Sequence, residues 1–129
     1  MPGRVLLDTN IAIGFLAGDE SVVKRVAEAA EVLAPVVAVG ELYFGAHRSA
    51  RAEQNLDRVR EFVSAVSVVG VDSDTAAVYG RLKDVLRSKG RPIPDNDLWI
   101  AAIGMQHDLT IVTRDAHFES VDGLTIERW

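Results

Sequence analysis

The sequence predicts a three-layer α/β/α sandwich around a central parallel sheet. Short apolar runs recur along the chain, and segments with helical spacing of apolar residues separate them. Strands that alternate with helices in this way form parallel sheets whose two faces are covered by the helices. At 129 residues, with no linker or repeat, residues 1–129 are expected to form a single domain.

In the first half of the chain, residues 5–7 and 32–34 are apolar runs typical of short buried strands. The expected helices cover residues 10–16, 21–33, 35–47 and 52–65. Asp19 or Ser21 can cap the second of these helices, and Pro35 suits the first turn of the third.

In the second half, strands are expected over residues 67–71, 110–113 and 124–127, and helices over 73–88 and 95–107. Asp72 or Ser73 can cap the first of these helices, which Gly90 and Pro92 end. The segment before Asp95 must be extended, because proline disfavours helix in the residue before it. Sites in parallel sheets lie beyond the carboxyl ends of the strands, where Asp8 and Asp115 are expected.

The composition excludes several classes of protein. There is no cysteine, so disulfides and thiolate metal sites are impossible. No segment is long and apolar enough to span a membrane, and the first apolar run is too short for a signal peptide, so a cytoplasmic protein is expected. The formal net charge of −5 argues against binding nucleic acid by bulk charge alone. Basic residues nevertheless form two groups, which are either solvated helix faces or RNA contacts: Arg48, Arg51, Arg58 and Arg60, and Arg81, Lys83, Arg87, Lys89 and Arg91.

Four carboxylates stand in otherwise apolar surroundings. Asp8 and Asp115 follow strands, Asp97 opens an apolar helix, and Glu41 interrupts the uncharged stretch 32–47. Each has a purely structural explanation, as a cap, a turn residue or the partner of a buried arginine. If the four converge, however, their repulsion must be neutralised, and a divalent cation is the simplest neutraliser. The sequence therefore outlines a metal-dependent site.

Other polar residues are assigned supporting roles or none. Thr9, Thr113 and Asn96 are close enough in sequence to the carboxylates to orient them. Asp95 is expected to be solvated or to cap its helix, and Trp99 to pack in the core or at a subunit contact. The histidines receive surface or packing roles and no metal: His47, His107 and His117.

The order of these residues closely resembles the PIN-domain ribonucleases, in particular the VapC-type toxins of bacterial toxin–antitoxin pairs. Four segments carry the resemblance, namely 5–10 (VLLDTN), 39–45 (VGELYFG), 93–102 (IPDNDLWIAA) and 111–118 (IVTRDAHF). Residues 123–127 also fit, so the resemblance covers nearly the whole chain.

The resemblance implies an α/β/α fold, an RNA substrate, a homodimer and a VapB-like antitoxin partner. It also implies Mg²⁺ or Mn²⁺ held by catalytic Asp8, Glu41, Asp97 and Asp115. The chain departs from the family pattern at two places. His117 stands where an acid often follows the fourth carboxylate, and Ala34-Pro35 stands where a serine or threonine often precedes the glutamate helix.

The chemistry follows from these ligand types. Oxygen ligands suit Mg²⁺ or Mn²⁺ rather than zinc. A metal-activated water would then cut RNA to leave 5′-phosphate and 3′-hydroxyl ends. Asp8 and Asp97 are expected to be shared metal ligands, Glu41 to bind metal or orient the water, and Asp115 to act directly or through a water. RNA binding should depend on metal, and the acidic cleft could receive an arginine or lysine from the antitoxin.

Four other classes of protein combine acidic residues with a parallel sheet or a capped helix. A receiver domain needs two adjacent acids after its first strand and a lysine after its last, whereas this chain has Asp8 alone and Arg114. A phosphatase built on the first-strand aspartate needs a second aspartate two residues later, where Asn10 stands. A non-toxin PIN nuclease that processes RNA and a non-catalytic acidic binding module stay open.

Overall fold

Strand β1 (Arg4–Leu7) lies at the centre of a five-stranded parallel sheet. In the computed structural model, which describes residues 3–129, the strand order is β3-β2-β1-β4-β5. The other strands are β2 (Glu31–Pro35), β3 (Ser67–Val69), β4 (Thr110–Val112) and β5 (Ile126–Glu127). Each pairs in parallel with its neighbours, so all five carboxyl ends meet at one edge of the sheet.

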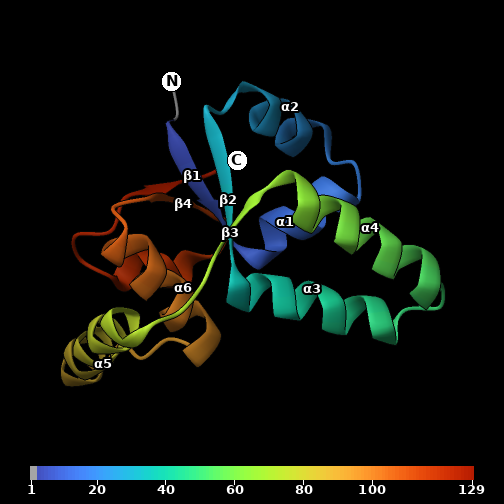
Figure 1. The fold of residues 1–129 in the computed structure, drawn as a ribbon. Helices are drawn as coiled ribbons and strands as arrows, with labels where there is room; N and C mark the ends of the chain where they lie inside the picture. Colours follow the sequence, from blue (N-terminus) through green and yellow to red (C-terminus); the bar gives the residue numbers. More distant parts are fainter. Residues whose placement is uncertain (1–2) are drawn as a thin grey trace.

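Helices cover both faces of this sheet, which confirms the predicted sandwich (Figure 1). They are α1 (Thr9–Leu16), α2 (Glu20–Glu28), α3 (Val36–Arg48), α4 (Ala52–Ala65), α5 (Ser73–Ser88) and α6 (Asp95–Gln106), followed by the short 3₁₀ helix η1 (Ala116–Ser120). Helices α5 and α6 lie on one side of the strands, and α1, α2 and α4 lie on the other (Figure 1). Within the described residues, no helix has the length and apolarity that crossing a membrane requires.

The core is divided by the sheet into two parts, as the alternation of side chains along β1 requires. Leu6 packs with residues of α5 and α6, whereas Val5 and Leu7 pack with residues of α1, α2 and α4. Helix α3 contributes to both parts, through Ala38 on one side and Val39 on the other. It therefore spans the carboxyl edge of the sheet, where the candidate site lies.

Three expected boundaries were wrong by more than one residue. The helix expected over 21–33 ends at Glu28, because residues 31–33 instead pair with Arg4–Leu6 of β1. β3 stops at Val69 and β5 starts at Ile126, so both edge strands are shorter than expected. Helix α6 begins after Pro94, which places Asp95, Asn96 and Asp97 inside its first turn and not at its cap.

Candidate active site

Asp8 joins β1 to α1 and is buried, with 4% of its surface exposed. Its backbone N–H donates to the carbonyl of Val112 at 2.9 Å, which fixes it beside β4. Its Oδ1 accepts from the N–H of Thr9 at 2.8 Å, and its Oδ2 accepts from the hydroxyl of Thr113 at 2.7 Å. Burial raises the pKa of Asp8 despite these two hydrogen bonds, and the charges of Asp97 and Asp115 raise it further.

Thr113 links two of the carboxylates. Its side chain is buried just past the end of β4, and its oxygen accepts the backbone N–H of Asp115 at 2.9 Å while its hydroxyl donates to Asp8. Asp115 in turn caps η1, because its Oδ1 accepts from the N–H of His117 at 2.9 Å. The predicted supporting role of Thr113 thus has a geometric basis.

Asp97 and Asp115 are brought together through His117. The imidazole Nδ1 lies 2.9 Å from Asp97 Oδ2 and 3.1 Å from Asp115 Oδ1. The hydrogen bond to Asp97 is the main reason that the pKa of His117 is raised, and the two negative charges add to it. Asp97 also lies at the N-terminal end of α6, where the helix dipole favours a negative charge.

Glu41 is half-buried on α3, and its Oε1 accepts from the hydroxyl of Thr9 at 3.0 Å. Ala34-Pro35 has no hydroxyl that could donate a hydrogen bond to Glu41. Thr9, the residue after Asp8, donates this bond instead. Helix α3 is less buried than its composition suggests, since Phe44, one turn after Glu41, has 67% of its surface exposed.

The donor set fits a divalent cation. Asp97 and Asp115 are close enough to Asp8 for their charges to raise its pKa. Thr9 donates hydrogen bonds to both Asp8 and Glu41 and so connects these two carboxylates. Within residues 3–129, no lysine or arginine forms a salt bridge with any of the four carboxylates. Single ligand atoms of Asp97, Asp115 and His117 lie within 4.8 Å of one another, close enough to hold one ion. Clustered carboxylates without an internal cation favour a bound metal.

The family model for the PIN domain matches residues 5–124, a span that contains all four carboxylates. The chain belongs to the PIN-domain family. The resemblance noted from four sequence segments is confirmed over nearly the whole chain.

Relatives of this PIN domain are VapC proteins. It is 32% identical to the tRNA(fMet)-specific endonuclease VapC of Shigella flexneri over 129 residues, covering 98% of each chain. It is 30% identical to ribonuclease VapC2 of Haemophilus influenzae Rd, again over 98% of both chains. Among solved structures, the DNA-bound VapBC of Salmonella typhimurium superimposes with a TM-score of 0.92 at 29% identity and 98% coverage of each chain.

Other residues of the PIN domain that the sequence singled out lie outside the carboxylate cluster. Asn96 is exposed on the first turn of α6 and makes none of the hydrogen bonds that connect the carboxylates. Asp95 accepts from Tyr79 at 3.0 Å and Lys83 at 3.2 Å, which ties α6 to α5. Trp99 stacks on the Tyr79 ring of α5 at 3.8 Å, so it has a packing role within the chain.

The five basic residues of the PIN domain that are expected to contact RNA are exposed. Arg48 ends α3, about 10 Å along the helix axis from Glu41, and Arg51 follows it at the start of α4. Arg87 lies in the last turn of α5 and Arg91 shortly after it, and Lys89 between them forms a salt bridge with Asp122. None of these five side chains forms a salt bridge with the carboxylate cluster in the described part of the chain.

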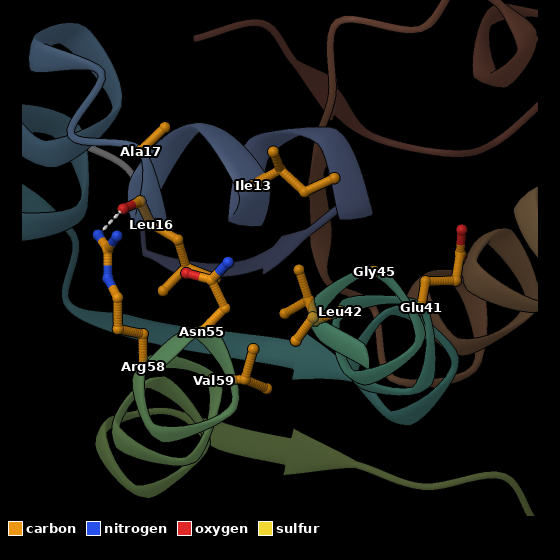
Figure 2. A pocket seen from close by; sticks show the side chains of 10 residues that line it. Ile13, Leu16, Ala17, Glu41, Leu42, Gly45, Asn55, Arg58 and Val59 are labelled. Carbon is orange, nitrogen blue, oxygen red and sulfur yellow. Dashed lines mark hydrogen bonds between the residues drawn. The ribbon is translucent and has the colours of Figure 1, made fainter. Parts of the chain in front are cut away.

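An apolar groove of about 350 Å³ runs between α1, α3 and α4 of the PIN domain (Figure 2). Its apolar lining includes Ile13, Leu16, Leu42 and Val59. Figure 2 shows Glu41 at one end of this groove, far from Arg58 at the other. Ile13 is 54% exposed, a large apolar side chain that sequence periodicity alone does not place on a surface.

Proposed function

We propose that this protein is a metal-dependent endoribonuclease and the toxin of a type II toxin–antitoxin pair. One observation carries the proposal. Four carboxylates from four separate elements at the carboxyl edge of a PIN-type sheet are connected by hydrogen bonds through Thr9, Thr113 and His117, and no lysine or arginine of the described chain neutralises them. The names of the VapC relatives as ribonucleases and endonucleases support the same reaction class.

Asp8 and Asp97 are the shared ligands of Mg²⁺ or Mn²⁺ in this proposal. When bound, the cation acidifies a coordinated water and offsets the charge that develops on the phosphate oxygens. Thr113 and the N–H of Thr9 each hold one oxygen of Asp8, and the hydroxyl of Thr9 holds Oε1 of Glu41, so both carboxylates are fixed in direction. Glu41 is half-buried and able to orient the attacking water, and Asp115 binds the metal directly or through a water.

The products should carry 5′-phosphate and 3′-hydroxyl ends. A water nucleophile attacks phosphorus in line with the leaving 3′ oxygen, so the RNA 2′-hydroxyl takes no part as a nucleophile. Arg48, Arg51, Arg87, Lys89 and Arg91 are the proposed backbone contacts. Because the cluster is negative until metal binds, RNA affinity should fall sharply in EDTA.

The groove between α1, α3 and α4 is the proposed docking place of a VapB-like antitoxin. Its apolar lining fits an amphipathic segment, and Glu41 at its end fits an arginine or lysine that follows that segment. Solved relatives described as VapBC support such a partner. An antitoxin whose tail lacks its basic residues should inhibit incompletely. Full inhibition by that tail variant would disprove the role of the basic residue. The proposed toxin also acts as a homodimer, which sedimentation equilibrium tests directly.

The deciding experiment compares wild type with Asp97→Asn on end-labelled RNAs in Mg²⁺, Mn²⁺ or EDTA. The panel includes initiator tRNA, because two VapC relatives are named for tRNA(fMet). Asp95→Asn is the matched control, since Asp95 lies two residues away on the same helical turn but pairs with Lys83.

Metal-dependent cutting by wild type and Asp95→Asn, lost in Asp97→Asn and leaving 5′-phosphates, is the expected result. Equal cutting by folded Asp97→Asn would overturn the assigned site. A folded wild type that neither cuts the panel nor binds Mn²⁺ in calorimetry would overturn the nuclease, leaving the acidic binding module.

A further inference from the structure

His117 lies at the exposed side of the carboxylate cluster, although only a packing or surface role was expected for it from the sequence. Its side chain is 48% exposed, and Asp97 and Asp115 beside it are 17% and 30% exposed. One ring nitrogen faces an oxygen of each aspartate. An imidazole between two candidate metal ligands is itself a candidate ligand.

The backbone fixes the place of this imidazole. The N–H of His117 donates to Asp115, which caps η1, and the next residue, Phe118, is fully buried in the core. The backbone at His117 is therefore held by its hydrogen bond to Asp115 and by the buried side chain of Phe118, the next residue. The histidine is not a free surface side chain that happens to meet a carboxylate.

The spacing of the three donor atoms suits one small cation. Neighbouring ligands of an octahedral ion with bonds of about 2.1 Å lie about 3 Å apart, as the geometry of an octahedron requires. His117 Nδ1 lies 2.9 Å from Asp97 Oδ2 and 3.1 Å from Asp115 Oδ1. Both nitrogen–oxygen distances are thus already ligand-to-ligand distances, and ligand atoms of all three residues lie within 4.8 Å of one another, so a cation could replace the shared proton with little movement of the side chains.

We propose that His117 is a metal ligand, and that the resulting mixed nitrogen and oxygen site selects Mn²⁺ over Mg²⁺. The inference rests on the proposed metal-dependent function and concerns this chain's own donor set. Mg²⁺ prefers oxygen ligands and water, whereas transition-metal ions accept imidazole nitrogen. Mn²⁺ also suits the carboxylates that make up the rest of the set.

The test compares Mn²⁺ and Mg²⁺ affinities by calorimetry at one fixed pH for wild type, His117→Asp and His117→Ala. His117→Asp keeps a ligand but makes it oxygen, so the selectivity for Mn²⁺ over Mg²⁺ should fall by about tenfold or more. His107→Ala is the matched control, because His107 caps the far end of α6. Pulsed electron paramagnetic resonance of bound Mn²⁺ should detect a histidine nitrogen in wild type and His107→Ala, and none in His117→Ala.

The outcomes separate this inference from the proposed function. If Mn²⁺ binding requires Asp97 while the nitrogen signal survives in His117→Ala, the nuclease site stands and His117 is not a ligand. Unchanged metal selectivity in His117→Asp would likewise overturn the inference alone. If folded wild type binds neither metal, the proposed function and this inference fail together.

Discussion

Thr113→Val tests whether the buried hydroxyl of Thr113 organises the cluster. Valine keeps the shape of the side chain and removes its oxygen. Two hydrogen bonds are lost, the 2.7 Å bond to Asp8 Oδ2 and the 2.9 Å bond from the N–H of Asp115. The first joins two buried groups, whereas the second lies nearer the surface, where water can replace it.

The expected loss in the free energy of unfolding is about 2 kcal/mol, because hydrogen bonds to charged groups contribute roughly 1.5–3 kcal/mol. For a domain of this size, 1 kcal/mol shifts the Tm by about 3–5 °C, so Tm should fall by roughly 6–10 °C. The hydroxyl also lowers the pKa of Asp8, so its removal should raise that pKa further and weaken Mn²⁺ binding.

The assay is thermal and urea unfolding in EDTA, followed by Mn²⁺ calorimetry. Thr110→Val is the matched control, being the same substitution on β4 at a half-buried site; its change should stay within about 0.5 kcal/mol. Equal Tm values for the two variants would refute the reasoning. The reasoning would also be refuted if Thr113→Val lowered stability by the same amount in an Asp8→Ala background. In that background the hydrogen bond between Thr113 and Asp8 is already absent.

Three further substitutions or titrations give distinct expectations. Burial raises the pKa of Asp8 in the folded protein above its ordinary 3.8, so ionised Asp8 lowers the stability of the fold as pH rises above that value. Metal-free Asp8→Asn should therefore be at least as stable as wild type at pH 7 in calorimetry. The same variant should gain less stability from Mn²⁺. A methyl group at Gly104 would lie 2.8 Å from the side chain of buried Ile111, so Gly104→Ala should lower the urea midpoint, because overpacking of about 1–3 kcal/mol exceeds a helix gain of about 1 kcal/mol. In metal-free protein, NMR titration should give His117 a pKa above 6.5. Protonated His117 then stabilises the fold below pH 6.5, and this stabilisation should be lost as pH rises through the raised pKa.

Each of these expectations has its own contrary result. A metal-free Asp8→Asn variant several degrees less stable than wild type would show that its hydrogen bonds outweigh its desolvation. Gly80→Ala, at an exposed helical glycine with open space around it, should stabilise the protein; equal gains at Gly104 would show that Ile111 can move aside. A His117 pKa that does not fall in Asp97→Asn would remove Asp97 as the cause of the shift.

The sequence predicted the layers and the positions of the carboxylates because both depend on local patterns. Apolar runs identify parallel strands, and strands place the residues that follow them at one edge of the sheet, as for Asp8. The end of α2 could not be predicted in this way. Val32 and Leu33 fit the helical spacing of α2, and pairing with distant β1 residues decides their conformation.

Contacts between distant side chains were also beyond the sequence. Thr9 and Glu41 are 32 positions apart, and Asp97 and His117 are 20 apart, yet each pair is hydrogen-bonded. A single sequence does not show which distant side chain a hydroxyl or an imidazole will contact. The spacing of His117 two residues after Asp115, at a position where the family often has an acid, was the one available signal.

The order of the strands has a consequence for synthesis on the ribosome. β1 is made first, yet one of its edges stays unpaired until Thr110–Val112 emerges and inserts beside it as β4. Until then Asp8 lacks both the backbone carbonyl of Val112 and the hydroxyl of Thr113. A nascent chain therefore has no assembled cluster, and nuclease activity can begin only after nearly the whole chain has left the exit tunnel, which delays damage to RNA near its own ribosome.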